Sequence, residues 1–401
     1  MTRLEELIKE LCPNGVEYKH LGEVATISRG GSLQKKDYTE CGIPCIHYGQ
    51  IYTHYGLFAD KTLSYISEET ARKQKFAEPG DIVMAVTSEN IDDVCKCTAW
   101  LGNEKVAVSG HTAIIHHFIN PKYLVYWLHS AMFYEQKIKI AHGTKVIEIA
   151  PAKLADVILP VPPLPVQEEI VRILDSFTEL TAELTAELTA RKKQYEYYRD
   201  KLLTPQHSEL LRISDIATTN IGLATSVTKF KSTSGVLLLH NSDIQQNAIV
   251  LKSVEYITEE FARRNASKIL QKDDIITVHT GDVGTSAVID EKYAGAIGFT
   301  TITTRIKDKS KITPQYLCHY LNSNLCKSSI ASMTISDRSN LNQSSFEKLV
   351  VPVPPLETQN KIVQILDNFD SICSDLKIGI PAEIEARKKQ YEFYRDKLLS
   401  F

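Results

Sequence analysis

One helical segment of the 401-residue chain occurs twice, almost without change. Residues 190–203 read ARKKQYEYYRDKLL and residues 386–399 read ARKKQYEFYRDKLL, so thirteen of fourteen positions are identical. A second pair reads PVPPLPVQEEIVRILDSF at 160–177 and PVPPLETQNKIVQILDNF at 352–369, with twelve of eighteen positions identical. An internal repeat constrains the fold more than any local pattern does. The chain is therefore expected to contain two equivalent halves.

The segments upstream of each repeat resemble one another only weakly. The stretch HLGEVATISRG at 20–30 aligns with RISDIATTNIG at 212–222, and EPGDIVMAVTSEN at 78–90 aligns with QKDDIITVHTGDV at 271–283. The divergence lies in these globular parts, and the identity lies in the helices. We infer that the two helices meet identical partners, while the two domains meet different ones.

The globular parts are expected to be mixed α and β. Short β-branched or apolar runs such as DIVMAVTS and IGFTTITTRI are typical of strands. The sequences NPKY at 120–123 and TPQY at 313–316 each place a capping residue before a proline, which indicates the start of a helix.

Long helices are expected after the proline-rich segments, because proline favours extended backbone and can begin a helix. The first helix is predicted over 166–203, without interruption. At 1.5 Å per residue its length is roughly 57 Å. In the second copy, Gly379 and Pro381 predict a break and a helix restart with Pro381 in the first turn.

Matching apolar stripes on the two helices predict that they pack together. The first stripe includes Ile170, Leu174 and Phe177, and the second includes Ile362, Leu366 and Phe369. If a twofold relates the halves, the helices run antiparallel. The segment LCPNGVEYKHLGEV at 11–24 aligns with 203–216, which predicts that the N-terminal segment follows the C-terminal helix in space and closes a pseudo-twofold ring.

Bulk composition excludes some classes of protein. The net charge of −3 gives no global basic field, so any affinity for nucleic acid must come from local patches. No apolar run approaches the roughly 20 residues that a membrane span needs. The eight cysteines form no C-x-x-C motif, which favours reduced thiols in the cytoplasm. The spacing of Cys41, Cys45, His47 and His54 fits no structural zinc pattern.

Two variable domains that alternate with two near-identical, proline-entered helices resemble the specificity subunit of a type I restriction–modification system. The resemblance covers essentially the whole chain and rests on PVPPL…Q…I…ILD and its duplication. It implies an α+β fold, in which two mixed α/β target-recognition domains are separated by two long antiparallel helices in a pseudo-twofold, circular arrangement. The expected boundaries are 1–19 for the ring-closing segment, 20–159 and 206–351 for the two domains, and 160–205 and 352–401 for the repeated regions with the spacer helices.

The same resemblance implies a function and a set of partners. Each domain is expected to read one half of a bipartite, asymmetric double-stranded DNA site, and the helices are expected to dock two methyltransferase subunits. Restriction subunits join through the complex. The chain is then not itself an enzyme and carries no cofactor. S-adenosylmethionine is expected on the methyltransferase, whose target base in the family is adenine.

Two other functions remain open from the residues alone. A coiled-coil scaffold that binds only protein explains the helices, but not two diverged domains with matched basic loops. A DNA methyltransferase acting alone needs a catalytic motif. The sequence NPKY only partly resembles the Asn-Pro-Pro-aromatic motif of such enzymes, and helix capping explains it as well.

Polar and basic residues in matched loops are the candidates for DNA contact, because Lys and Arg bind phosphates and polar side chains read base edges. The polar loops before the last strand of each domain, 141–146 and 336–341, are the strongest candidates. A solvated face or a strand-end turn explains any single residue equally well. The predicted DNA-binding residues are Arg29, Ser32, Lys35, Lys36, His47, Tyr48, Gln50, Arg72, Lys73, Lys75, Ser88, Glu89, Gly143, Thr144 and Lys145 in the first half, and Lys229, Lys231, His240, Asn241, Arg263, Arg264, Lys268, Thr280, Asp282, Arg338, Ser339 and Asn340 in the second.

The duplicated helix is the candidate for protein binding, because a surface that is the same in both copies fits a repeated partner better than two different DNA sequences. Tyrosine and arginine are common in protein interfaces. Mutual packing of the helices is the alternative, above all for Tyr195 and Leu202. The predicted partner-binding residues are Arg191, Lys192, Tyr195, Tyr198, Arg199, Arg387, Lys388, Tyr391, Tyr394 and Arg395.

The first long helix contains a four-residue repeat, TELTAELTAELTA, at 178–190. Four residues lengthen a helix by about 6 Å and rotate its end by about 40° beyond a full turn. One base pair of DNA rotates by roughly 35°. We hypothesise that one TAEL unit sets one base pair of the gap between half-sites.

Overall fold

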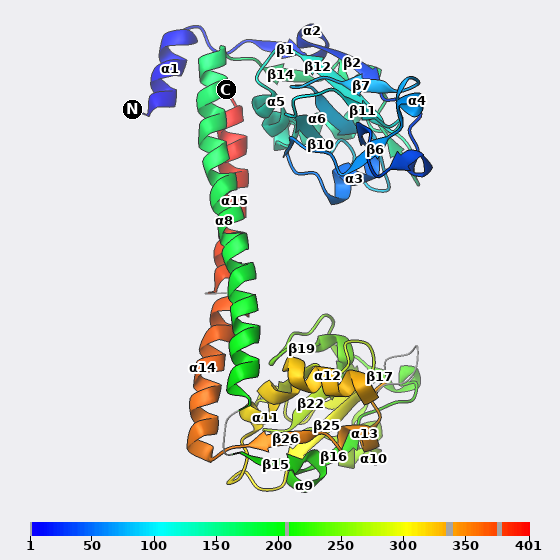
Figure 1. Cartoon of the computed structure of the whole chain (residues 1–401), viewed down its shortest axis with the longest axis vertical. Helices are drawn as coiled ribbons and strands as arrows, with labels where there is room; N and C mark the ends of the chain where they lie inside the picture. Colours follow the sequence, from blue (N-terminus) through cyan, green and yellow to red (C-terminus); the bar gives the residue numbers. More distant parts are fainter. Residues whose placement is uncertain (1, 205–207, 334–339, 375–378) are drawn as a thin grey trace. The chain divides into compact units, whose positions relative to one another are not determined.

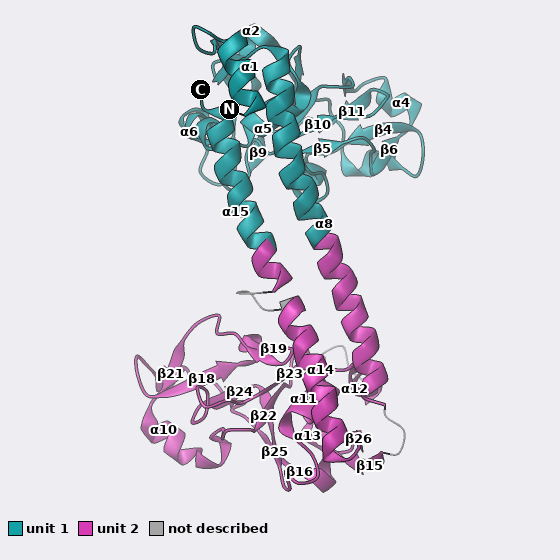
Figure 2. Cartoon of the chain, turned by 90° about the vertical axis from the view of Figure 1, so that its left-hand side faces the viewer, with its two compact units in different colours: residues 1–184, 384–401 teal, residues 185–383 magenta. Residues whose placement is uncertain are grey.

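The computed structural model describes residues 2–204, 208–333, 340–374 and 379–401. The chain divides into two compact units, shown in separate colours in Figure 2. Unit 1 comprises residues 1–184 and 384–401, and unit 2 comprises residues 185–383. Each unit therefore combines a globular domain with helical segments from distant parts of the sequence.

The domain of unit 1 is built on two five-stranded sheets (Figure 1). The first sheet has the order β2 (Ala25–Arg29), β12 (Thr112–His117), β8 (Ile82–Ala85), β10 (Cys97–Trp100) and β5 (Phe58–Ala59). The second has the order β3 (Tyr38–Thr39), β6 (Ser64–Ile66), β4 (Ile43–Ile46), β11 (Val106–Val108) and β7 (Lys75–Ala77). Two short pairs complete it, β1 (Tyr18–His20) with β14 (Ile158–Pro160) and β9 (Thr87–Ser88) with β13 (Ile147–Glu148).

The domain of unit 2 repeats this topology with fewer strands in each sheet. One sheet has the order β16 (Ala217–Ile221), β25 (Thr301–Ile306), β22 (Ile275–Val278) and β23 (Ser286–Val288). The other has the order β17 (Lys231–Ser232), β21 (Glu255–Ile257), β18 (Val236–His240) and β24 (Ile297–Phe299). The pairs are β15 (Glu209–Arg212) with β26 (Val350–Val353) and β19 (Ile244–Gln245) with β20 (Ala248–Ile249).

Even the register repeats between the two domains. Tyr18 in β1 pairs with Pro160 in β14, and Leu210 in β15 pairs with Pro352 in β26. Both pairs are antiparallel, and corresponding residues lie 192 positions apart, as in the repeat itself. The predicted α+β fold with two mixed α/β domains is confirmed.

Short helices connect the strands in both domains. They are α2 (Leu21–Val24), α3 (Tyr48–Thr53), α4 (Glu68–Ala71) and α7 (Pro151–Leu154) in unit 1, with the 3₁₀ turn η1 (Lys35–Asp37). Those of unit 2 are α9 (Ile213–Ile216), α10 (Glu259–Arg264) and α13 (Gln343–Phe346), with the 3₁₀ turns η2 (Thr228–Phe230), η3 (Asn241–Asp243) and η4 (Ala266–Lys268).

The predicted capped helices form in both halves, each as a pair. Asn120 caps α5 (Pro121–Leu128) by accepting from the backbone N–H groups of residues 122 and 123, and α6 (Ala131–Ile140) follows. Thr313 caps α11 (Pro314–Leu321) by accepting from the backbone N–H of Tyr316, and α12 (Asn324–Met333) follows. The hydroxyl groups of Ser130 and Ser323 accept from the backbone N–H groups of Phe133 and Cys326, the third residues of the second helices, at 3.3 and 3.2 Å.

The long helices confirm the sequence-based expectation. Helix α8 (Leu164–Leu202) is continuous over 39 residues, which corresponds to about 58 Å. In the second copy α14 (Leu356–Ser374) ends and α15 (Ile380–Leu399) begins after it, with Pro381 in its first turn. Residues 375–378 lie outside the described part of the chain.

Within each unit, two helix segments lie side by side and run antiparallel (Figure 2). In unit 1 the ring of Phe177 in α8 stacks on Tyr394 in α15, with 5.4 Å between centroids. In unit 2 Phe369 in α14 stacks on Tyr198 in α8 at 6.3 Å. The interplanar angles are 22° and 23°, so the repeat reproduces the same helix contact twice.

The hydrophobic core of each unit extends from the domain into both helix segments. In unit 1 the first turns of α8 contribute the buried Ile170 and Leu174, and the last turn of α15 contributes Leu399. In unit 2 the first turns of α14 contribute Ile362 and Leu366, and Leu203 closes the core after α8. Each domain thus packs on the start of one long helix and on the end of the other.

The N-terminal segment contacts the C-terminal end of the chain within unit 1. Helix α1 (Arg3–Leu11) begins with a capping box at Thr2 and shares a buried cluster with Leu399 through Leu4. The hydroxyl of Tyr18 donates to the backbone oxygen of Phe401 at 2.9 Å. The ring-closing role of the segment, like the five domain boundaries, stays a prediction.

Three smaller expectations concern disulfides, membrane spans and metal sites. None of the eight cysteines forms a disulfide. Within the described ranges, no helix is both long and apolar enough to span a membrane. The same ranges hold no cluster of three His, Cys, Asp or Glu side chains arranged to bind a metal ion.

Candidate nucleic-acid interface and repeated helix contacts

Two predicted loops of unit 1 meet around a polar hollow. Ser32 and Lys36 from the 29–38 loop face Lys73, which follows α4. The hollow has a volume of about 310 Å³ and also includes Asp37 and Glu69. The side chains of Lys35, Arg72 and Lys75 are exposed nearby in sequence. Basic side chains from two separate segments therefore gather at one place, as phosphate binding requires.

A second hollow of unit 1 brings together the end of β9 and helix α3. Tyr48, Ser88 and Glu89, all predicted from sequence, line about 390 Å³ of space. The rest of the wall consists of Tyr52, Thr87, Asn90, Asp93 and Val146. Val146 directly follows the exposed residues Gly143, Thr144 and Lys145. Aromatic rings beside carboxylate and amide groups are suited to reading a base edge.

Three other predicted residues of unit 1 are held by their own domain. The guanidinium of Arg29 donates to the Gly110 oxygen at 2.9 Å and pairs with Glu148 at 3.1 Å. The side chain of Gln50 donates to Ser64 at 2.7 Å and accepts from the backbone N–H of His47 at 3.0 Å. Burial lowers the pKa of His47, and nearby His111 and Lys35 lower it further. These groups shape the loops in this structure.

In unit 2 three predicted segments converge on one cluster. Asn241 Nδ2 donates to the backbone oxygen of Thr280 at 2.7 Å, and Thr280 Oγ1 donates to Asn340 Oδ1 at 2.8 Å. Asp282, exposed on the same loop, accepts from Thr285 Oγ1 at 2.6 Å. Arg338 and Ser339 lie outside the described residues. Three loops far apart in sequence therefore present amide and hydroxyl groups together.

A carboxylate that the sequence did not single out organises the basic residues of unit 2. Glu255 pairs with Lys231 at 2.6 Å and with His240 Nε2 at 3.2 Å. These hydrogen bonds, with that from Lys231 the stronger, hold the pKa of the Glu255 carboxyl below its usual value. Glu255 is in β21, and only the pairing of β21 with β17 and β18 brings it to these loops. No local sequence signal could have found it.

The remaining basic residues of unit 2 differ in how far contacts within the domain occupy their side chains. Lys229 and Arg263 are exposed, and Arg264 pairs with Glu260 one turn away on α10. Lys268 instead donates to the backbone oxygens of Ile221 and Gly222, the second at 3.0 Å. Burial lowers the pKa of the Lys268 ammonium. The ammonium of Lys268 is therefore occupied by its own domain.

The duplicated helix end docks on its domain through the same contacts in both units. In unit 2 Asp200 Oδ1 accepts from the backbone N–H of Asn324 at 3.2 Å and from Arg199 Nε at 3.3 Å. In unit 1 Asp396 Oδ1 accepts from the N–H of Ala131 at 3.1 Å and from Arg395 at 3.0 Å. Each carboxylate thus lies at a helix N-terminus, where negative charge is stabilised.

The glutamine of the proline-entered repeat also has the same role twice. Gln167 Oε1 accepts from the N–H of Asn120 at 2.9 Å, and its Nε2 donates to the Pro162 oxygen at 2.7 Å. Gln359 does the same with Thr313 at 2.9 Å and with Pro354 at 2.8 Å. The glutamine fastens the domain's capped helix to the start of the long helix, which explains its place in the repeat.

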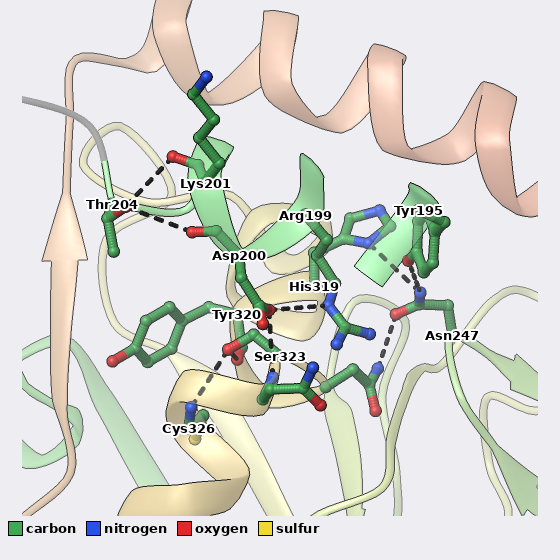
Figure 3. A network of polar contacts seen from close by, with 12 residues as sticks. Tyr195, Arg199, Asp200, Lys201, Thr204, Asn247, His319, Tyr320, Ser323 and Cys326 are labelled. Atoms are coloured by element: carbon green, nitrogen blue, oxygen red, sulfur yellow. Dashed lines mark hydrogen bonds and ion pairs between the residues drawn. The ribbon is translucent and has the colours of Figure 1, made fainter. Parts of the chain in front are cut away.

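The contact between domain and helix in unit 2 includes a partly buried polar network (Figure 3). Asn247 donates to Asp370 at 2.6 Å and accepts from Asn322 at 2.7 Å, and Tyr195 is within 3.4 Å of its amide nitrogen. His319 Nε2 donates to Asp367 at 2.8 Å, and its Nδ1 faces the Asn247 amide at 3.3 Å. Burial raises the pKa of Asp370.

Unit 1 uses different side chains at the matching positions. Tyr126 occupies the place of His319, and its hydroxyl donates to Asp175 Oδ1 at 2.6 Å. Lys122 pairs with Asp175 Oδ2 at the same distance. The Tyr126 ring contacts Phe58 edge-on and Tyr391 at an angle. The repeated helices therefore contact the two domains through chemically different side chains.

The predicted partner-binding residues fall into three groups by burial. Tyr195 and Arg199 are buried in unit 2, with Tyr195 in the core cluster, as the mutual-packing alternative expected. Arg387, Tyr391, Tyr394 and Arg395 are partly buried in unit 1. Arg191, Lys192, Tyr198 and Lys388 are exposed. Internal contacts therefore account for only part of the identity between the copies.

Comparison with known proteins identifies the family. The family model described as type I restriction modification DNA specificity domain matches residues 13–191 and again residues 205–386. The chain belongs to this family. As a type I specificity subunit it is the non-catalytic, DNA-recognising part of such a system. The double match agrees with the internal repeat and with the two units of the structure.

Curated relatives and solved structures agree with this assignment. A putative type I restriction enzyme specificity subunit of Haemophilus influenzae is 29% identical, over 100% of this chain and 98% of the relative. The EcoR124I/EcoR124II specificity subunit of Escherichia coli is 32% identical over 59% of this chain and 60% of its own. A solved structure from work on complex assembly and conformational transition of the type I restriction–modification system superposes with a TM-score of 0.66 at 17% identity, covering 96% of this chain and 98% of that one. The S subunit from M. genitalium superposes at 0.51 with 14% identity, covering 97% of both chains, which supports the fold.

Proposed function

We propose that the two domains of this specificity subunit read the two halves of a bipartite, asymmetric site in double-stranded DNA. The polar clusters of the two units support this proposal because they differ in chemistry. Unit 1 offers Tyr48, Ser88 and Glu89, whereas unit 2 offers Asn241, Thr280 and Asn340. Different hydrogen-bonding groups select different bases, so each domain prefers its own half-site.

The proposal also assigns the long helices to two methyltransferase subunits, with restriction subunits joining through the complex. The observation that carries it is the identity of exposed residues in the two copies. Three exposed residues of the first copy are Lys192, Glu196 and Lys201. The aligned residues of the second copy are identical and also exposed, namely Lys388, Glu392 and Lys397. Packing within the chain does not require this identity, whereas a partner bound twice does.

This function places the chain in the cytoplasm beside the DNA. S-adenosylmethionine belongs to the methyltransferase subunit in this proposal. The target-recognition side chains then act only by fixing where on the duplex that subunit is held.

The proposal is tested by measuring methyl transfer to DNA by this chain alone, by the methyltransferase subunit alone and by the two combined. We expect activity with S-adenosylmethionine only when this chain and the methyltransferase subunit are combined. Activity of this chain alone would instead identify a free-standing methyltransferase. Assembly with the subunit but no DNA binding, in a gel-shift measurement with genomic fragments, would identify a protein-binding scaffold.

A further inference from the structure

The single position that differs between the two copies of the helix end carries an exposed aromatic ring in both. Tyr197 occupies it in the first copy and Phe393 in the second. The exposed fraction of each side chain is 62%. One exposed ring needs no explanation, but the same exposure at both places of a repeat fits a partner that is bound twice.

Both rings are held by the same chain of aromatic contacts. Tyr197 meets Tyr198 edge-on at 5.3 Å, and Tyr198 stacks on Phe369 of α14. Phe393 meets Tyr394 edge-on at 5.4 Å, and Tyr394 stacks on Phe177 of α8. A ring supported in this way loses little conformational freedom when a partner binds.

The surroundings of the two rings are also the same. Lys201 lies 5.9 Å from the centre of the Tyr197 ring, and Lys397 lies 5.9 Å from that of Phe393. One turn before each ring, Lys193 and Lys389 are exposed on the same side of the helix, and Lys389 also pairs with Glu385 at 3.6 Å. Each ring is therefore an apolar point within a basic helix surface.

We propose that Tyr197 and Phe393 are the two anchors by which this chain binds its two methyltransferase subunits. Each ring enters an apolar pocket on one subunit, and carboxylates around that pocket meet the flanking lysines. The Tyr-to-Phe difference shows which part of the side chain matters. The ring is common to both copies and the hydroxyl is not, so the hydroxyl lies at the mouth of the pocket.

Duplex DNA fits these surfaces less well than protein does. Lysines bind phosphates, but an aromatic ring gains from nucleic acid mainly by stacking on unpaired bases. Aromatic anchors surrounded by charged side chains are characteristic of protein interfaces. The inference rests on the proposed function and names the residues that carry its protein contact.

Light scattering of the full chain mixed with its methyltransferase subunit counts the bound copies. We expect two copies on the unaltered chain, one copy on Tyr197→Ala or on Phe393→Ala, and none on the double variant. Affinity at an altered place should fall by roughly 30-fold or more, the effect of removing a buried aromatic anchor. Tyr197→Phe and Phe393→Tyr should bind two copies as before. Lys201→Glu with Lys397→Glu should weaken binding several-fold.

Phe118 provides the matched control, because its side chain is 76% exposed but the aligned residue of the second half is Lys311. Phe118→Ala should leave both copies bound, and circular dichroism should show that every variant is folded. Two copies on the double alanine variant, or unaltered affinity in the charge-reversed variant, would overturn the inference and leave the proposed function intact. Loss of DNA affinity with unchanged assembly would assign the rings to DNA. An unaltered chain that binds no methyltransferase subunit would refute the proposed function itself.

Discussion

At the scale of single residues, the repeat is best explained by side chains that fasten helix to domain. Asp200 and Asp396 each bind a helix N-terminus, and Gln167 and Gln359 each connect two backbone segments. The two glutamines are buried, and losing such a buried partner typically costs about 1–3 kcal/mol. These residues are identical in the two copies because both domains present backbone groups, which do not depend on the local sequence.

One residue gives unit 1 a dependence on pH that unit 2 does not share at the matched position. His129 aligns with Asn322, and its ring donates to the Val125 oxygen at 2.9 Å. Burial is the main cause that lowers the pKa of His129 to about 4. The unfolded chain takes up this proton near pH 6.5. The contribution of neutral His129 to the free energy of unfolding should therefore be fully present above about pH 6.5 and should fall as the pH drops toward 4.

The change His129→Asn tests this dependence. Urea unfolding of the chain at pH 7 and pH 5 should show a loss of stability on the order of 2 kcal/mol at the lower pH. In the variant, the free energy of unfolding should fall less between pH 7 and pH 5 by this amount, whatever its value at pH 7. The exposed His54→Asn is the control, and it should behave as the unaltered chain does. The same pH effect in His129→Asn and in the unaltered chain would contradict the assignment.

Some residues of the candidate site could be predicted from the sequence, and others could not. The loops containing Ser88, Asn241 and Thr280 could be predicted because they follow recognisable strands. Glu255 and Asn247 could not, because their partners are distant in sequence. Asn247 also adopts a left-handed backbone, with φ of 58°, in a turn that carries no glycine at this place. Their roles depend on tertiary packing alone.

At the scale of elements, α8 is the part of the chain whose length has a direct consequence. It continues without a break through the TAEL repeats, and Leu180, Leu184 and Leu188 form a half-buried stripe at four-residue spacing. The hydroxyl groups of Thr181 and Thr189 in these repeats donate to carbonyl oxygens four residues earlier. The repeat could be predicted as a helix because its residues favour that state and no proline interrupts it.

Insertion of one further TAEL unit into α8 tests the helix as a spacer. The insertion adds about 6 Å and about 40° beyond a full turn, and one base pair rotates DNA by roughly 35°. We expect the gap between the two half-sites to change by one base pair, with both half-sites unchanged. Mapping of methylated bases gives the gap directly. The length-preserving Thr189→Ala should leave it as it was, and an unchanged gap after insertion would refute the spacer role.

At the scale of the whole molecule, the two units repeat one plan with two purposes. The topology, the register of β1 and β15 and the docking of the helix ends are the same in both. The loops of the two domains differ, and so do the domain side chains that contact the helices. The duplicated sequence could predict the shared plan, because repetition implies equivalent folds. It could not predict which bases are read, because base selection depends on side-chain geometry and on DNA shape.

The central claim is that two unlike domains of one chain read two separate half-sites for one methyltransferase. Mapping every methylated base in a genome that contains this chain and its methyltransferase subunit tests it most directly. The account predicts one motif of two unlike halves with a fixed gap. With Asn241→Ala and Thr280→Ala, only one half of the motif should lose its base preference. A continuous motif, or a change in both halves at once, would contradict the account.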